Sequence, residues 1–118
     1  MIVAGTDDIE DFLAGYPASI AELGRALRSF VREAAPDSAE SLHLGWKVIA
    51  FGRARKFCAV APHANWVNLQ FHDGAALDDP DGLLTGTGKS MRHVKVAGRD
   101  ALDGGLRALI ADAARRAG

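Results

Sequence analysis

Residues 56–71 read KFCAVAPHANWVNLQF, and this stretch decides the fold. Two strand-forming runs, 56–61 and 66–71, lie on either side of a four-residue connection, 62–65. In the second run apolar and polar residues alternate, which is the pattern of a half-buried strand. Parallel neighbours would need a crossover of a dozen or more residues, so the short connection predicts an antiparallel hairpin.

Further strands are predicted on both sides of this hairpin. Short alternating segments at 42–44 and 47–51 precede it, separated by Gly45 and ended by Gly52, and residues 53–55 form a turn. After it, residues 73–82 are acidic and rich in turn formers, which predicts a loop. A last strand is expected at 91–96. The sheet should therefore have about five strands.

Helical periodicity appears only outside this strand region. A short pattern at 7–13 stops at Gly15-Tyr16-Pro17, and Pro36 ends a longer helix. A third helix is expected near the C-terminus, with Asp100 as a plausible N-cap and Asp103 close by. The apolar stripes recur at three- and four-residue steps, at Ile20, Leu23, Leu27, Phe30, Val31 and Ala34, and again at Leu102, Leu106, Leu109, Ile110 and Ala113.

This order predicts an α+β fold, an antiparallel sheet with N-terminal helices and a C-terminal helix packed on one face. The 118 residues fit one domain, 1–118. The content of 48% hydrophobic and 25% charged residues is ordinary for a globular chain, and the net charge of −1 indicates no overall attraction to nucleic acid or membrane.

Cytoplasm is the expected location. Cys58 is the only cysteine, which excludes an intramolecular disulfide. Residues 1–8 lack the features of a signal peptide, and no segment approaches the roughly 18 apolar residues of a membrane span. A membrane partner is not expected. Nucleic acid is disfavoured because Trp46 and Trp66 are not part of an RNP-like aromatic pair.

A ligand could meet the sheet face that the helices leave open. Alternation places Trp66, Asn68 and Gln70 on that face, and Met91, His93 and Lys95 beside them if 66–71 and 91–96 share a sheet. No acid occurs between Ser41 and His72 or between Gly82 and Arg99, so the strand layer is locally basic. Such a layer favours anionic partners. It is equally typical of an ordinary solvated face with solubilising lysines.

The densest chemical pattern is GLLTGTGKS at 82–90. It is not a Walker A loop, because Leu83 stands where the first glycine is required and a strand, not a helix, follows. Its backbone N–H groups could still form an anion nest, whereas the simpler interpretation is that Gly86 and Gly88 supply positive φ for a turn.

Nucleophilic catalysis finds little support in the residues. Cys58 lies in mid-strand among apolar neighbours, where a lone cysteine is usually a small buried hydrophobe. Ser90 and His93 are near one another only in sequence, and no Gly-x-Ser-x-Gly elbow occurs. No catalytic residue is predicted, and binding is favoured over enzymatic activity.

Several segments together resemble the YdhG-like family of small bacterial domains of unknown function. They are YP at 16–17, REAAPD at 32–37, GWK at 45–47, AFG at 50–52, NLQFHDG at 68–74 and LLTGTGKSMRHVKV at 83–96. The resemblance implies an α+β fold with a helix-flanked sheet. One branch of that family resembles a frataxin-like iron chaperone that supports iron–sulfur cluster and haem assembly. This chain departs from that branch at 45–47, where a Gly-Met-Pro type stretch is usual.

Two functional hypotheses follow. In the first, a non-enzymatic domain without a cofactor binds a small anionic ligand or an acidic protein: Lys89 and Arg92 hold the anion, His93 makes binding depend on pH, and Thr87, Trp66 and Asn68 complete the site. In the alternative, an iron chaperone binds iron through Asp78, Asp79, Asp81 and His72, although these acids are also typical of a solvated turn. A homodimer is a further open possibility.

Overall fold

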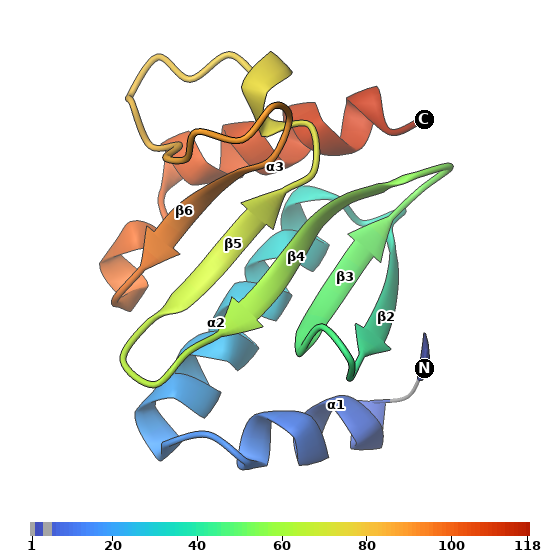
Figure 1. The fold of residues 1–118 in the computed structure, drawn as a ribbon, viewed down its shortest axis with the longest axis vertical. Helices are drawn as coiled ribbons and strands as arrows, with labels where there is room; N and C mark the ends of the chain where they lie inside the picture. Colours follow the sequence, from blue (N-terminus) through green and yellow to red (C-terminus); the bar gives the residue numbers. More distant parts are fainter. Residues whose placement is uncertain (1, 4–5) are drawn as a thin grey trace.

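The computed structural model describes residues 2–3 and 6–118, and side chains from residue 8 onward. Met1 and residues 4–5, part of the segment assessed for a signal peptide, lie outside the described residues. Figure 1 shows one sheet with helices behind it. The elements in chain order are β1 (Ile2–Val3), α1 (Thr6–Ala14), α2 (Ala18–Ala34), β2 (Ala39–His43), β3 (Val48–Gly52), β4 (Lys56–Pro62), β5 (Val67–Phe71), the 3-10 turn η1 (Gly74–Ala76), β6 (Arg92–Val96), the 3-10 turn η2 (Arg99–Ala101) and α3 (Gly104–Arg116).

The sheet is antiparallel throughout, and its strands lie in sequence order from β1 to β6. This confirms the predicted α+β class and its five strands, to which the structure adds the two-residue strand β1. The predicted hairpin is also confirmed, with Val60 opposite Leu69. Short loops join β2 through β5, so each strand pairs with its successor.

The hydrophobic core lies between the sheet and the helices. In Figure 1, α2 passes behind the strands and α3 lies behind the upper end of β5 and β6. The stripe predicted for α2 is confirmed at Ile20, Leu23, Leu27 and Val31, which are buried, whereas Phe30 is only partly buried. Full burial of each large apolar side chain contributes about 1.5–3 kcal/mol before the entropy of folding is counted. The strands complete the core with Leu42, Ile49, Phe51, Phe57, Cys58, Val60, Val67, Leu69, Phe71, Val94 and Val96.

The predicted element boundaries need correction at two places. β2 runs from Ala39 to His43 rather than 42–44, because Ala39 and Glu40 pair with Gly52 and Phe51. At α3, Asp103 is the N-cap and its carboxylate accepts a hydrogen bond from the Leu106 N–H at 3.0 Å, while Asp100 lies in η2. The remaining predicted strands differ by about one residue at their ends, as is usual where pairing frays.

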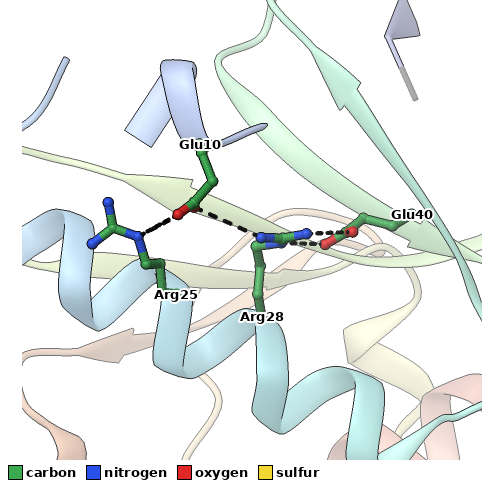
Figure 2. A network of polar contacts seen from close by, with 4 residues as sticks. All are labelled: Glu10, Arg25, Arg28 and Glu40. Carbon is green, nitrogen blue, oxygen red and sulfur yellow. Dashed lines mark hydrogen bonds and ion pairs between the residues drawn. The ribbon is translucent and has the colours of Figure 1, made fainter. Parts of the chain in front are cut away.

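A charge network crosses the helix side of the sheet near β2 (Figure 2). Arg28 of α2 is 7% exposed and lies between Glu40 of β2 and Glu10 of α1. Arg25 donates a 2.7 Å hydrogen bond to the outer side of the Glu10 carboxylate. The network therefore ties α1 and β2 to α2.

None of the described helices lies on the opposite face of the sheet, and Figure 1 looks onto this open face. The register places Asn68 opposite Lys95 and Gln70 opposite His93, which confirms that the polar residues of these two strands share one surface. Any site on the sheet surface is therefore found here or at the strand ends.

Candidate functional site

A cationic hollow is lined by the β3–β4 turn, η1, the loop before β6 and the last turn of α3. These segments meet at the upper end of the sheet in Figure 1. The volume of the hollow is about 340 Å³. Cationic side chains come from three separate segments: Arg55 from the β3–β4 turn, Lys89 from the loop before β6, and Arg116 from α3. We call this hollow the Lys89 pocket; its lining residues are Arg55, Asp73, Ala75, Ala76, Lys89, Ser90 and Arg116.

Two of the three cations in the Lys89 pocket are held in place. Arg55 donates a hydrogen bond from Nη2 to the carbonyl of Arg116 at 2.6 Å, and the same nitrogen lies 3.8 Å from the Asp73 carboxylate. Arg116 is anchored through Nε to Asp112 at 3.2 Å. Lys89 is exposed and forms no ion pair within the described residues. Asp73 is the one acid among the described residues of the lining, so their formal charge is positive.

Arg92 does not line this pocket. Its guanidinium donates through Nη1 to the carbonyl of Gly88, and to that of Met91 at 2.8 Å. The Arg92 side chain also packs against Gly74, so closely that a methyl group at Gly74 would lie 2.5 Å from its Cβ. Arg92 thus holds the loop that carries Lys89.

The glycines of that loop only partly follow expectation. Gly86 has a φ of 131°, as the turn interpretation predicted, and Gly82 has a φ of 66°. Gly88 is not among the positive-φ residues of the described chain, so the prediction for Gly88 was wrong. Its carbonyl instead accepts from Arg92, which fixes the loop by a side chain rather than by backbone conformation.

His93 and Thr87 lie apart from the pocket lining. The His93 Nε2 is 3.1 Å from the Thr85 hydroxyl, and the backbones of the two residues exchange hydrogen bonds of 2.8 and 2.9 Å. Thr85 thereby covers the outer edge of β6 at this point. Thr87 is exposed in the loop beyond it.

Trp66 and Asn68 belong to a third location. The Trp66 ring stacks on His63 with 5.0 Å between centroids, and Lys95 Nζ lies 4.5 Å from the indole centroid. Asn68 accepts from Trp66 Nε1 at 3.0 Å and lies 3.2 Å from His63 Nε2. Within the cluster, the Asn68 side-chain amide is hydrogen-bonded to both aromatic neighbours, Trp66 and His63. The six residues predicted for one ligand site therefore occupy three places, and only Lys89 lines the cationic pocket.

Sequence reasoning missed Arg55 and Arg116 as members of that pocket. Arg55 belonged to the predicted turn and to the basic segment without acids, so its charge was a usable signal. Arg116 is 61 residues away and is brought to Arg55 by the packing of α3. Nothing local in the sequence indicated that pairing.

The residues of the iron alternative are also separated. The Asp79 carboxylate accepts hydrogen bonds from the N–H groups of Leu83 and Leu84 at 2.8 and 2.9 Å, so it caps the loop. Asp78, Asp79 and Asp81 face α3, whereas His72 lines a groove on the open face. Within the described part of the chain, no group of three His, Cys, Asp or Glu side chains is placed to hold a metal ion.

Cys58 is fully buried in β4, which confirms the prediction of a small buried hydrophobe. Burial raises the pKa of its thiol far above the ordinary value. A thiol kept protonated and out of solvent is a poor nucleophile. None of the described helices is long and apolar enough to span a bilayer.

Comparison with known proteins gives a family. No curated protein and no solved structure matched the chain. A family model described as a domain of unknown function, DUF5655, matches residues 9–115, from within α1 to the last turn of α3. The prediction of a small domain family of unknown function is confirmed, while the YdhG-like name stays a prediction. Since this family model covers most of the length of the chain, the chain belongs to the DUF5655 family of domains of unknown function.

Proposed function

We infer that this domain binds a small multivalent oxyanion, such as a phosphate-bearing metabolite, in the Lys89 pocket. One observation carries the proposal: Arg55, Lys89 and Arg116 come from three distant segments and meet around one hollow. Among the described residues that line this hollow, Asp73 is the single acid. Cations that are clustered around one hollow attract an anion together. Two of the three cations, Arg55 and Arg116, are held in place by a contact with a backbone carbonyl and a contact with a carboxylate. A preorganised cluster loses less entropy when it binds an anion.

The roles of the residues follow from their contacts. Lys89, which has no ion pair in the described residues, supplies the charge and donors that the fold does not use. Arg55 and Arg116 supply positive potential at fixed positions. Arg92 supports the site indirectly by holding the loop through Gly88. Binding without catalysis, a cytoplasmic location and kinship with the YdhG-like domains remain parts of the same proposal.

The test is a calorimetric titration of the protein with inorganic pyrophosphate at low ionic strength. Lys89→Gln should weaken binding by about tenfold, the equivalent of one hydrogen bond to a charged group. Arg107→Gln is the matched control, because Arg107 is exposed on the same helix as Arg116 but does not line the pocket. Equal weakening by both variants would mean unspecific charge attraction, and no effect of Lys89→Gln would remove Lys89 from the site.

A further inference from the structure

The open face of the sheet carries a groove of about 300 Å³, separate from the Lys89 pocket. Its floor contains Ala50 and Ala59, each 2% exposed. Trp46 from the β2–β3 turn is 83% exposed and lines it, as does Met91, which is 43% exposed. We call it the open-face groove; the other lining residues are His43, Val48, Lys56, Gln70 and His72.

The open-face groove exists because of the register between neighbouring strands. Ala59 lies directly opposite Ala50 on one side and Gln70 on the other. Directly opposite side chains on one face of a sheet are neighbours, and two alanines leave unfilled the space that larger pairs would occupy. The result is a shallow apolar floor at the centre of the sheet with larger side chains around it.

The electrostatics of the groove favour an anion with a single charge. Among the described residues that line it, Lys56 is the only one with a formally charged side chain. Strands β2 to β6 contain one acid, Glu40, and its carboxylate points to the helix side, where Arg28 binds it. A carboxylate on the open face therefore meets no like charge from these strands, and a nearby cation attracts it.

One residue that lines the groove, His72, carries a polar atom without a partner in the described part of the fold. The Nδ1 atom of His72 is buried and has no hydrogen-bond partner among the described residues. The great majority of buried polar side-chain atoms are satisfied, so this unpartnered nitrogen is an exception that calls for an explanation. His72 directly follows β5 and lines the groove together with Lys56.

We propose that the open-face groove binds a small, flat, apolar monocarboxylate. Its ring lies on the alanine floor against Trp46 and Met91, and its carboxylate lies at Lys56. The volume is at the lower end of the range for ligand pockets, which fits a one-ring compound. An exposed indole is a suitable partner for such a ring, because aromatic stacking adds to the burial of apolar area. This site is independent of the oxyanion proposal and shares no residue with the Lys89 pocket.

Tryptophan fluorescence can locate the binding event, because the chain has two tryptophans and only Trp46 lines the groove. The Trp66→Phe variant leaves Trp46 as the sole reporter. Titration with 3-phenylpropionate should change its emission saturably. The neutral analogue 3-phenylpropan-1-ol should bind about two- to fivefold more weakly, the equivalent of one exposed ion pair.

Three substitutions in this background separate the contributions. Lys56→Gln should abolish the preference for the acid over the alcohol. Ala59→Leu should fill the floor and reduce binding of both compounds at least tenfold. Lys95→Gln, which removes the same charge from the same face outside the groove, should leave the preference unchanged.

Ala59→Leu could disturb the strand, so Trp46→Ala provides a second test at a side chain that is 83% exposed. This variant is made in the chain that retains Trp66, and its binding is measured by calorimetry. It should weaken binding at least fivefold without changing the circular dichroism spectrum. The proposal is overturned if 3-phenylpropionate produces no saturable change, if acid and alcohol bind equally, or if Trp46→Ala binds as the unmodified chain does. It is also overturned if light scattering shows a dimer that Trp46→Ala dissociates, since the groove would then belong to an interface between two copies.

Discussion

Arg28 and Glu40 form a bidentate ion pair between α2 and β2, with Nε–Oε2 and Nη2–Oε1 distances of 2.5 and 2.7 Å. The side chains are 8% and 18% exposed, so the pair is largely removed from water. The hydrogen bond to Glu40 raises the pKa of the Arg28 guanidinium, against the lowering effect of burial. The pair explains how a strand with a charged residue on its core side can lie against a helix.

Arg28→Met should lower the free energy of unfolding by about 3 kcal/mol, because it leaves the Glu40 carboxylate partly buried without its partner. The double variant Arg28→Met/Glu40→Leu should recover much of this loss. Arg25→Met is the matched control: Arg25 is 44% exposed, so its pair with Glu10 should contribute less than about 1 kcal/mol. Urea unfolding of the four proteins measures the differences. Equal losses for Arg28→Met and Arg25→Met would contradict this interpretation.

Gly74→Ala should destabilise the protein by about 1–3 kcal/mol, the usual cost of forcing a methyl group into a packed site. The new methyl would lie 2.5 Å from Arg92 Cβ, so β6 or η1 must move. Gly104→Ala is the matched control, because a methyl there meets nothing within 4 Å. At the start of α3 it should be neutral or stabilising by up to about 1 kcal/mol. Thermal unfolding of both variants gives the comparison, and a neutral Gly74→Ala would refute the close contact.

His43 should titrate below its ordinary pKa of 6.5. Partial burial lowers the pKa, and the positive charge of Lys56 lowers it further. Between the folded pKa and about 6.5, the unfolded chain binds a proton that the folded one does not, so stability rises with pH in this window and falls as the solution is acidified through it. An NMR titration of the His43 ring measures the pKa. Lys56→Gln should raise it, whereas Lys95→Gln should not, and a His43 pKa at or above 6.5 would exclude both causes.

Cys58 should react with a thiol reagent such as DTNB only when the protein opens. It is fully buried, and burial raises the pKa of its thiol. Labelling should therefore be slow in buffer and accelerate across the urea transition, as expected for a core site exposed by unfolding. A Cys58→Ala/Ser90→Cys variant, with its thiol on an exposed loop, should react at once. Rapid labelling of native Cys58 would show that β4 opens locally.

Much of the fold was predictable because local patterns agree with the tertiary arrangement. The alternation at 66–71 named the core side of β5 correctly, and Val67, Leu69 and Phe71 are all fully buried. The stripe of α2 was equally informative. The position of Glu40 was not predictable. A charged residue on the core side of β2 contradicts the alternation of apolar and polar residues unless its partner, Arg28, is known.

The candidate sites were less predictable than the fold. Lys89, Arg92 and His93 are close in sequence, and this suggested one site. The structure gives them different partners, because Arg92 bonds to loop carbonyls and His93 to Thr85. The open-face groove went unpredicted, since the lack of acids between Ser41 and His72 indicated a basic layer but not where its small side chains meet.

The amino-acid sequence by itself determined the class of fold, the antiparallel hairpin and the basic character of the strand layer, because periodicity and charge are properties of neighbouring residues. Only the tertiary structure decided that Arg116 meets Arg55 and Lys89, and that Ala50 lies beside Ala59. The Arg116–Arg55 contact joins residues 61 positions apart and depends on the packing of α3. The Ala50–Ala59 contact joins neighbouring strands and depends on their register, which shifts between Phe51 and Gly52. Neither the packing of α3 nor this register shift can be read from the local sequence.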